Sequence, residues 1–282
     1  MRWKHVTGLK GEKMTIGFIG LGNMASAVIG GIIREKIAEP SDIVGWALTE
    51  ATRERVKKEF GIQIAGSDKQ VAELADIIVL AVKPVFLNDA AKDVVAGIKE
   101  SGNGNKKIIY SVIAGKSIET LEKIFGKDSK IVRAMPNTPA LVGEGCTGVC
   151  INDAITEEEK EEALKIFGSF GKAYLIPERL IDTVGAVSGS SPAFVFMFME
   201  ALADAAVAGG MPRAQAYKFA GQAVLGSAKL MLETGQHPGE LKDMVCSPGG
   251  TTIEGVSVLE ESGFRAAIID AVAATIEKTK RL

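Results

Sequence analysis

A short stretch near the end of the chain combines the residue types that bind a small anion. Positions 247–252 read SPGGTT and lead into a segment of helical composition. Backbone N–H groups and hydroxyls at the start of a helix converge on one point, and that geometry holds a carboxylate. A plain N-capped helix start needs one Ser or Thr and not the whole combination. The stretch therefore predicts a ligand site with contacts from Ser247, Gly249, Gly250, Thr251 and Thr252.

A second glycine-rich turn lies near the start of the chain, where positions 20–25 read GLGNMA. In the dinucleotide fingerprint the first glycine permits the tight turn, the second lets the backbone approach a pyrophosphate, and the third small residue keeps helix and strand close. Gly20, Gly22 and Ala25 stand at those three positions. Because the turn follows a β-branched strand and precedes a helical pattern, it predicts a dinucleotide site and not an ordinary turn.

The end of the second predicted strand bears on which dinucleotide is bound. NAD-type sites place an Asp or Glu there to hold the ribose 2′-hydroxyl. Positions 45–49 read GWALT and contain no carboxylate, and Arg53 and Arg55 follow close behind Glu50. NADPH is therefore favoured, with NADH as the alternative, since the two arginines are equally compatible with a solvated helix face.

Another predicted strand ends in AVKP at positions 81–84. Ligands of open α/β sheets bind in the crevice outside the carboxyl ends of the strands. Lys83 can offer a cation to cofactor or substrate at this place, whereas the alternative is an ordinary surface lysine.

Short β-branched runs alternate with amphipathic stretches from residue 15 to residue 176. The runs are apolar on both faces, as in a parallel sheet covered by helices, and lie at 15–20, 42–48, 76–82, 107–113 and 130–135. Segments of crossover length lie between them, at 23–36, 50–60, 68–75 and 85–98. Weaker strands near 147–151 and 172–176 flank a helix that starts around Thr156 and are candidates to extend the sheet.

After Pro177 the composition becomes helical, at 190–209, 212–234 and 250–281. We therefore expect an α/β fold, with a Rossmann-type doubly wound sheet over 14–177 and an all-helical domain over 178–282. Bulky apolar residues surround the helix at 194–199. They exceed what a domain of roughly 100 residues covers by itself, so at least a dimer is expected.

The bulk composition favours a cytoplasmic protein with a small-molecule ligand. The 33 basic and 35 acidic residues are interspersed, which argues against nucleic acid or an anionic membrane as a partner. Cys146, Cys150 and Cys246 lack zinc-type spacing and are expected to be reduced thiols, with no metal bound. Residues 1–13 are basic and polar and are expected to be a leader or tag-like extension, not a signal peptide or anchor. The apolar run at 194–199 is too short and too closely followed by charges to predict a membrane span.

Together these segments resemble pyrroline-5-carboxylate reductases from residue 14 to the end of the chain. The motifs that carry the resemblance are FIGLGNM at 18–24, AVKP at 81–84, MPNTP at 135–139, SGSSPAF at 188–194, a predicted HPGELK turn at 237–242, and VCSPGGTTIEGVSVLE from 245. The last motif is far more specific than the glycine fingerprint.

The resemblance implies a Rossmann domain, an interlocked helical dimerisation domain, and NAD(P)H-dependent reduction of 1-pyrroline-5-carboxylate to proline. It implies a homodimer and is compatible with a decamer built from dimers. The substrate contacts it implies are those of the 247–252 stretch. The cofactor contacts are expected at Ile19, Gly20, Leu21, Gly22, Asn23, Met24, Ala47, Asp68, Ala81, Val82, Lys83, Pro84, Ile113 and Ala114.

The chain departs from the family pattern at two cofactor positions. Ala47-Leu48 replaces an Asn/Asp-Arg or Ser pair after the second strand, and Asp68 replaces an Asn before the third helix. These changes leave the choice between NADPH and NADH open.

Imine reduction needs a hydride donor against the C=N carbon and a proton on nitrogen, so orientation supplies much of the rate without a strong acid. The histidines fit this expectation, because His5 lies in the leader and His237 in a predicted turn or cap. We expect Thr252 to hydrogen-bond the ring nitrogen and Ser247 to help hold the carboxylate, with Lys83 as the third catalytic candidate.

Two other functions share a dinucleotide-binding domain of this kind. A β-hydroxyacid dehydrogenase would need a general base, typically a lysine entering the helical domain, and residues 188–217 contain none. A non-catalytic dinucleotide sensor would have no need of a second anion site, so the SPGGTT stretch argues against it.

Overall fold

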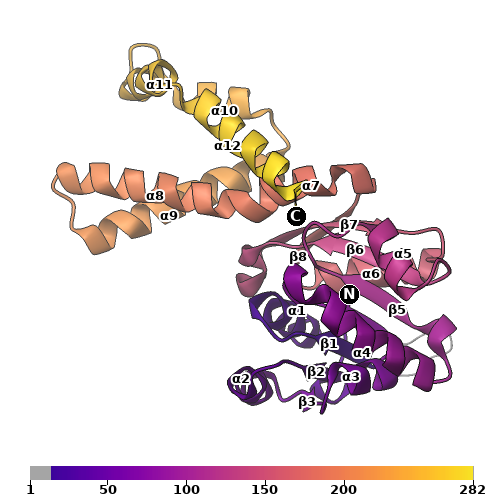
Figure 1. Cartoon of the computed structure of the whole chain (residues 1–282). Coiled ribbons are helices and arrows are strands. Elements are labelled where there is room, and N and C mark those ends of the chain that lie inside the picture. The colour runs from indigo at the N-terminus through magenta and orange to yellow at the C-terminus, as the bar shows by residue number, and fades with distance from the viewer. Residues whose placement is uncertain (1–13, 282) are drawn as a thin grey trace. The chain divides into compact units, whose positions relative to one another are not determined.

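The computed structural model describes residues 14–281, and the predicted leader at 1–13 lies outside the described residues. Internal contacts divide the chain into two units: Ser190–Thr275 forms the second, and the rest of the described chain, including the last turn of the final helix from Ile276, forms the first (Figure 1).

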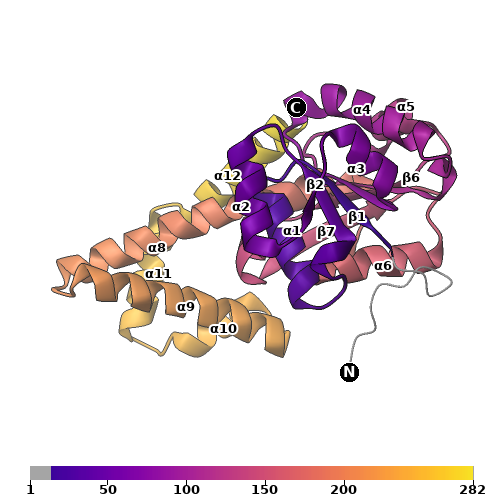
Figure 2. The same ribbon diagram turned by 90° about the horizontal axis from the view of Figure 1, so that it is seen from below.

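The first unit is built on one eight-stranded sheet with the order β3-β2-β1-β4-β5-β6-β7-β8. Figures 1 and 2 show this sheet with helices around it from two directions. All neighbours pair in parallel except β6 and β7, which are antiparallel. The strands are β1 (Ile16–Ile19), β2 (Ile43–Trp46), β3 (Gln63–Ile64), β4 (Ile77–Leu80), β5 (Ile108–Ser111), β6 (Lys130–Met135), β7 (Gly145–Ile151) and β8 (Gly171–Leu175).

Helices cover both faces of this sheet because successive strand residues point to opposite sides. One core packs Phe18 of β1 against α1 (Asn23–Arg34), α2 (Glu50–Phe60) and α6 (Glu157–Gly168). The other packs Ile19 against α3 (Asp68–Leu74), α4 (Leu87–Glu100) and α5 (Ile118–Phe125). Both cores confirm the expected doubly wound α/β fold.

The second unit consists of helices, drawn orange to yellow in Figure 1. They are α8 (Ser191–Ala208), α9 (Arg213–Thr234), α10 (Pro238–Val245), α11 (Thr251–Glu261) and α12 (Phe264–Thr279), whose last turn counts with the first unit. One local expectation was wrong, because residues 238–242 are not a turn but the start of α10. The segment 250–281 is helical as expected, in two helices separated at Gly263, whose φ is 72°.

The change to helical composition after Pro177 precedes the division between the two units. The short helix α7 (Ile181–Val184) packs on β6 and β7, and the buried guanidinium of Arg133 on β6 donates to Glu178 at 2.8 Å and to Asp182 at 3.3 Å. A π-helical turn, Gly185–Ser190, then leads into α8. Residues that read as helix therefore still belong to the packing of the sheet.

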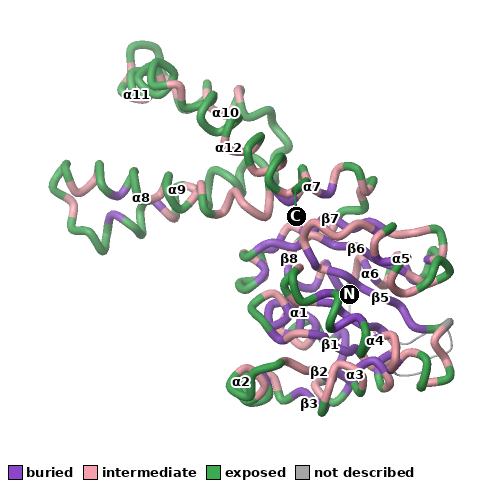
Figure 3. The backbone as a smooth tube through the Cα atoms, viewed as in Figure 1, coloured by how far each residue is buried: buried purple, intermediate pink, exposed green. Residues whose placement is uncertain are grey.

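The helices of the second unit bury little of their apolar surface. Their buried positions in the described chain are three alanines, Ala203, Ala216 and Ala220. Phe196 and Met197 of α8 are 62% and 68% exposed, and Phe219 of α9 is 66% exposed. Figure 3 shows the contrast between the purple strands of the first unit and the mostly green helices of the second. This surface needs a further covering partner, as soluble domains rarely leave such large apolar area open.

The continuous helical segment Glu178–Ala208 is long and apolar enough to cross a membrane by length and composition alone. This differs from the expectation drawn from residues 194–199, because the whole segment is longer than the run of bulky side chains. Exposed apolar helices that associate with another protein surface satisfy the same test.

Candidate functional site

The fingerprint loop is fixed by the strands on either side of β1. Gly20 donates its N–H to the carbonyl of Trp46 at the end of β2 over 2.9 Å. Its φ is 92°, and a Cβ on it would lie 2.9 Å from the carbonyl oxygen of Ala81, which follows β4. A larger residue is therefore excluded both by conformation and by space.

The helix after this loop has an open N-terminus. Gly22 is the N-cap of α1 and no side chain caps the helix. Within the described residues, the N–H groups of Asn23 and Met24 have no acceptor, and nothing lies within 4 Å of the place where a Cβ on Gly22 would stand. Free N–H groups and an empty approach fit the pyrophosphate of NAD(P)H, so the residues present suit the expected cofactor.

The other cofactor candidates on the sheet line the same carboxyl edge. Ala81, Val82, Lys83 and Pro84 follow β4, which neighbours β1, and the sheet order reverses between these two strands. Lys83 is exposed, and its ammonium contacts no carboxylate in the described chain. The residues are thus at the switch point where open α/β sheets bind ligands.

Ile113 and Ala114 lie beyond the end of β5, which stops at Ser111. The side chain of Ile113 is buried in the core under α3, α4 and α5, and its N–H approaches the Ser111 hydroxyl at 3.4 Å. A cofactor contact from Ile113 would therefore come from its backbone, while Ala114 is partly exposed.

Asp68 is the first residue of α3, which Ser67 caps by accepting from the N–H of Gln70 at 3.1 Å. Burial, with a smaller contribution from the charge of Asp93, raises the pKa of Asp68 to about 6. The strand before it hydrogen-bonds to β2, through Ala65 N–H to the carbonyl of Gly45 at 3.0 Å. Asp68 therefore stands at the start of α3, three residues after the segment that pairs with β2, and it brings a carboxylate where the resembled family has an amide.

The predicted anion loop between α10 and α11 is a tight turn. Gly250 donates its N–H to the Ser247 carbonyl over 3.0 Å, and Gly249 between them has a φ of 65°. With Pro248 at the second position, these are the features of a type II turn. A Cβ on Gly250 would stand 2.2 Å from the Ser247 hydroxyl oxygen, so the second glycine leaves room for that hydroxyl.

The turn opens onto the N-terminus of α11, which begins at Thr251 as expected. Gly250 is its N-cap, and no side chain caps it, so Thr252 does not act as a cap. In the described chain the hydroxyls of Ser247, Thr251 and Thr252 have no hydrogen-bond partner. Thr252 is half-buried and the other two are exposed. A hollow beside the loop is lined by Gly249, Gly250, Thr251, Glu254, Gly255 and Val258.

His237 has a structural role, as expected for a turn or cap. It is the N-cap of α10, and its Nδ1 accepts from the N–H of Gly239 at 3.1 Å. Burial raises the pKa of the Cys150 thiol to about 11, so this thiol is a poor nucleophile at neutral pH. Among the described residues, no group of three metal-ligating side chains is found.

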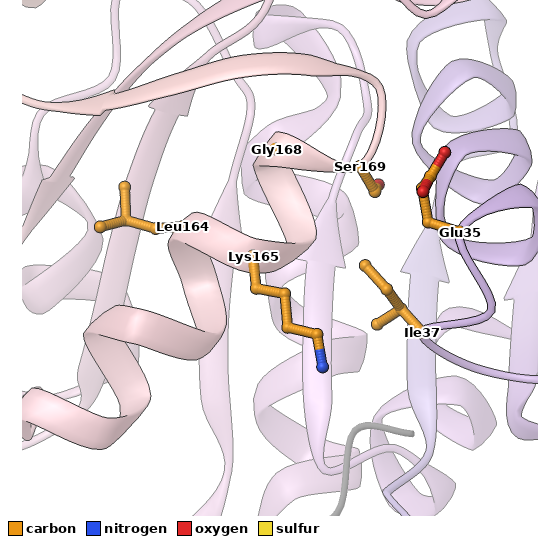
Figure 4. Close-up of a pocket in the computed structure, with 6 residues that line it drawn as sticks. All are labelled: Glu35, Ile37, Leu164, Lys165, Gly168 and Ser169. Atoms are coloured by element: carbon orange, nitrogen blue, oxygen red, sulfur yellow. The ribbon is translucent and has the colours of Figure 1, made fainter. Parts of the chain in front are cut away.

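A separate apolar pocket lies at the far end of α1 (Figure 4), lined by Glu35, Ile37, Leu164, Lys165, Gly168 and Ser169. The 12 residues of α1 put about 18 Å between this pocket and the fingerprint loop. It takes no part in the cofactor site.

Two positioning residues escaped the sequence interpretation. Asn137 of the MPNTP motif is buried, accepts from the N–H of Cys146 at 2.8 Å and donates to the carbonyl of Ser188 at 2.9 Å. It thereby fastens the start of the SGSSPAF motif to the sheet. Trp46 carries the guanidinium of Arg53 on its ring, 4.2 Å from the centroid. An aromatic residue at the end of β2, followed by nearby arginines, is the sequence signal that could have predicted this stacking contact.

Two family profiles match the chain. The one described as pyrroline-5-carboxylate reductase dimerisation covers residues 178–282, and the one described as NADP oxidoreductase, coenzyme F420-dependent, covers residues 15–132. The pyrroline-5-carboxylate reductase of Escherichia coli (strain K12) is 51% identical over 269 residues, which are 95% of this chain and 97% of that relative. The chain belongs to the pyrroline-5-carboxylate reductase family. The reductase of Methanosarcina acetivorans is 41% identical, with 96% of this chain and 98% of the relative covered.

Solved structures of pyrroline-5-carboxylate reductases have the same fold. The enzyme from Coxiella burnetii superposes with a TM-score of 0.86 at 34% identity, covering 96% of this chain and 98% of that one. The Plasmodium falciparum enzyme, solved with NADP bound, gives 0.85 at 33% identity, with 95% and 97% covered. Family membership confirms the resemblance, the fold class and the enzyme class, an NAD(P)H-dependent reductase that acts on a C=N bond.

Proposed function

We propose that this chain reduces 1-pyrroline-5-carboxylate to L-proline, the last step of proline biosynthesis, with its substrate on the 247–252 loop and its cofactor on the loop after β1. The observation that carries the proposal is the uncapped start of α11, where the hydroxyls of Ser247, Thr251 and Thr252 have no partner within the described chain. A structural helix start would satisfy these groups internally.

The substrate carboxylate is assigned to the Ser247 hydroxyl and the backbone N–H groups of 249–251. An uncapped helix N-terminus carries a partial positive charge, so it stabilises a carboxylate without a buried lysine or arginine. The type II turn presents Ser247 toward Gly250, since Gly250 has no Cβ to displace its hydroxyl. The loop thus fixes the acid end of the substrate and leaves the ring to be oriented.

We assign the hydroxyl of Thr252, the second residue of α11, to a hydrogen bond with the ring nitrogen of the substrate. Bound NAD(P)H supplies the hydride, and a cyclic imine that is already protonated is the better electrophile. The protein then needs to hold the ring in one orientation and to bond its nitrogen, which a neutral hydroxyl does. Lys83, exposed at the end of β4, is proposed as an electrostatic aid to anionic groups at the edge of the sheet.

Replacement of Thr252 tests this assignment. Thr252→Ala should cost about 2–4 kcal/mol of transition-state stabilisation, the scale of one preorganised hydrogen-bond partner. Steady-state kinetics should show kcat/KM for pyrroline-5-carboxylate lowered by roughly 10²-fold or more, with the Kd for NADP+ almost unchanged. Thr252→Ser is the matched control, because it keeps the hydroxyl and should retain most of the activity.

A structural role for Thr252 predicts another result. If Thr252 serves only to pack the start of α11, where it is half-buried, its replacement should lower the stability and change the rate little. Near-normal turnover of Thr252→Ala with a lowered melting temperature would therefore remove Thr252 from the chemistry.

We also propose a cytoplasmic homodimer, with a decamer built from dimers as the larger assembly. The exposed Phe196 and Met197 of α8 lie in the region matched by the dimerisation profile, which makes a second copy the natural cover for the apolar segment Glu178–Ala208, in place of a membrane. Sedimentation velocity without detergent should give a dimer or a multiple of it. A monomer whose sedimentation does not change with concentration would contradict this assignment.

A further inference from the structure

The end of β2 lies against the fingerprint loop. Ile19 of β1 pairs with Trp46, and the next residue, Gly20, donates its N–H to the Trp46 carbonyl over 2.9 Å. A dinucleotide whose pyrophosphate binds at the start of α1 places its adenosine ribose over the end of this second strand. The residues just after Trp46 therefore face the ribose 2′ position.

This place lacks the carboxylate of an NAD-type site but holds a positioned arginine. Arg53, in the first turns of α2, folds back over the loop, and its Nη1 donates to the Ala47 carbonyl at 2.6 Å and to the Leu48 carbonyl at 3.0 Å. The guanidinium carbon lies 4.2 Å from the centroid of the Trp46 ring. Two hydrogen bonds and a stacking contact leave the side chain little freedom to lose when a ligand binds.

The rest of the Arg53 guanidinium is unused. In the part of the chain that the structure describes, its Nε and Nη2 donate to no acceptor and no carboxylate forms an ion pair with it. Arg55, two residues on, is different. It pairs with Glu59 at 3.1 Å, and its Nη2 donates to the Leu21 carbonyl at 3.1 Å and lies 3.3 Å from the Ser26 hydroxyl. Arg55 thus braces the fingerprint loop, and its charge is partly compensated.

The start of α2 gives a second, independent feature at the same place. Its N-cap is Thr49, yet the Thr49 hydroxyl is hydrogen-bonded to that of Thr52 at 2.7 Å and caps no backbone N–H. The first N–H groups of this 11-residue helix are thus open to an anion.

From these contacts we infer that Arg53 binds the 2′-phosphate of NADPH and sets the preference of this chain for NADPH over NADH. Its free edge offers parallel N–H donors, which match two phosphate oxygens in a bidentate pair, and the N-terminus of α2 adds to the positive field. The hydrogen bonds to the Ala47 and Leu48 carbonyls fix the orientation of the guanidinium. The loop after β2 therefore needs no charged side chain of its own to bind the 2′-phosphate. Arg53 takes the place of the Arg or Ser side chain that the family pattern puts directly after the strand.

Two nucleotide fragments isolate this contact from catalysis. Adenosine 2′,5′-bisphosphate carries the 2′-phosphate and adenosine 5′-monophosphate lacks it, and neither can accept hydride. Isothermal titration of the full-length protein should show the bisphosphate bound more tightly. Arg53→Gln should weaken the bisphosphate roughly 10- to 100-fold, the range of a charge-assisted hydrogen-bond pair, and change the monophosphate by no more than about threefold.

Two matched variants complete the test. Arg53→Lys keeps the charge but loses the fork and the clamp on the carbonyls, so it should recover only part of the difference between the two fragments. Lys58→Gln removes one exposed positive charge from the same helix and should leave the difference intact, because in the described chain the Lys58 side chain makes no contact with the loop after β2. Melting curves check that each variant is folded.

Preserved discrimination between the fragments in Arg53→Gln would overturn the inference. Equal weakening of both fragments would do the same, since Arg53 would then support the loop and not read the phosphate. A loss in Lys58→Gln as large as that in Arg53→Gln would reduce the effect to general electrostatics and would also overturn it.

Discussion

The two glycine-rich loops of this reductase use the same physics with different support. Both lead into helices with no side-chain cap, α1 and α11, and both offer open N–H groups to an anion. The loop at Gly20 is held by β2 and β4 inside a buried sheet. The loop at Gly250 is exposed and is held by one turn hydrogen bond of its own.

This difference separates two ways of preorganising an anion site. A sheet fixes the first loop through the same contacts that stabilise the fold, so damage to that loop reaches both binding and stability. The second loop owes its shape to local turn chemistry, in which Pro248 and Gly249 set the backbone and Gly250 makes room for Ser247. Substitutions in this second loop should therefore weaken ligand binding without lowering the stability of the fold. Substitutions at the glycines test the contrast.

The largest effect is expected at Gly20. Gly20→Ala puts a Cβ 2.9 Å from the Ala81 carbonyl at a φ of 92°, so the strand end must move. NADP+ affinity, measured by titration calorimetry, should fall by roughly 100-fold or more, and unfolding should cost about 1–3 kcal/mol less, the scale of one strained residue.

Gly22→Ala is the control for this prediction. At Gly22 the backbone φ is −74° and no atom lies within 4 Å of the added Cβ, so the fold should be unaffected. The methyl group would nevertheless occupy the approach of the pyrophosphate. Tight NADP+ binding by Gly22→Ala would show that the pyrophosphate does not pass over this loop.

A smaller effect is expected at Gly250. Gly250→Ala brings a methyl group to 2.2 Å from the Ser247 hydroxyl, and the flexible serine side chain must turn away. The KM for pyrroline-5-carboxylate should rise roughly 10-fold, the value of one hydrogen bond to a charged group, while the melting temperature and the Kd for NADP+ stay close to those of the parent.

A double-mutant cycle with Ser247→Ala shows whether this effect passes through the hydroxyl. If it does, Gly250→Ala should add little in the Ser247→Ala background, because the displaced group is already absent. If the two substitutions instead raise KM independently and additively, Gly250 does not act by making room for the Ser247 hydroxyl.

Much of the fold could be predicted because the central strands are apolar on both faces and the helices between them have crossover length. β3 was missed, since Gln63 and Ile64 are too few residues to show a period. α5 was missed as well, although Ser117 caps it by accepting from the N–H of Thr120. The reversal of β7 was not predictable, because strand direction depends on pairing with a distant partner.

The candidate site divides in the same way. The glycines and the start of α11 at Thr251 follow from local rules of turns and helix ends, and the structure has them where the sequence placed them. The difference between Arg53 and Arg55 does not follow from sequence. Both read as charged positions on one helix, and only tertiary contacts with Trp46 and with Leu21 give them separate tasks.

The position of β1 also shapes how the chain reaches its native state. Within the described residues, the first strand along the chain is an inner one, flanked by β2 on one side and β4 on the other. The side of β1 that faces β4 can pair only after β4 has been synthesised. Ile16 then pairs with Ile77, and the N–H of Thr15 donates to the Asp76 carboxylate at 2.9 Å. Until then an apolar edge of four residues stays available to other nascent chains. Synthesis rate and chaperone supply should therefore affect the yield of this enzyme most strongly between the emergence of β1 and the emergence of β4 from the ribosome.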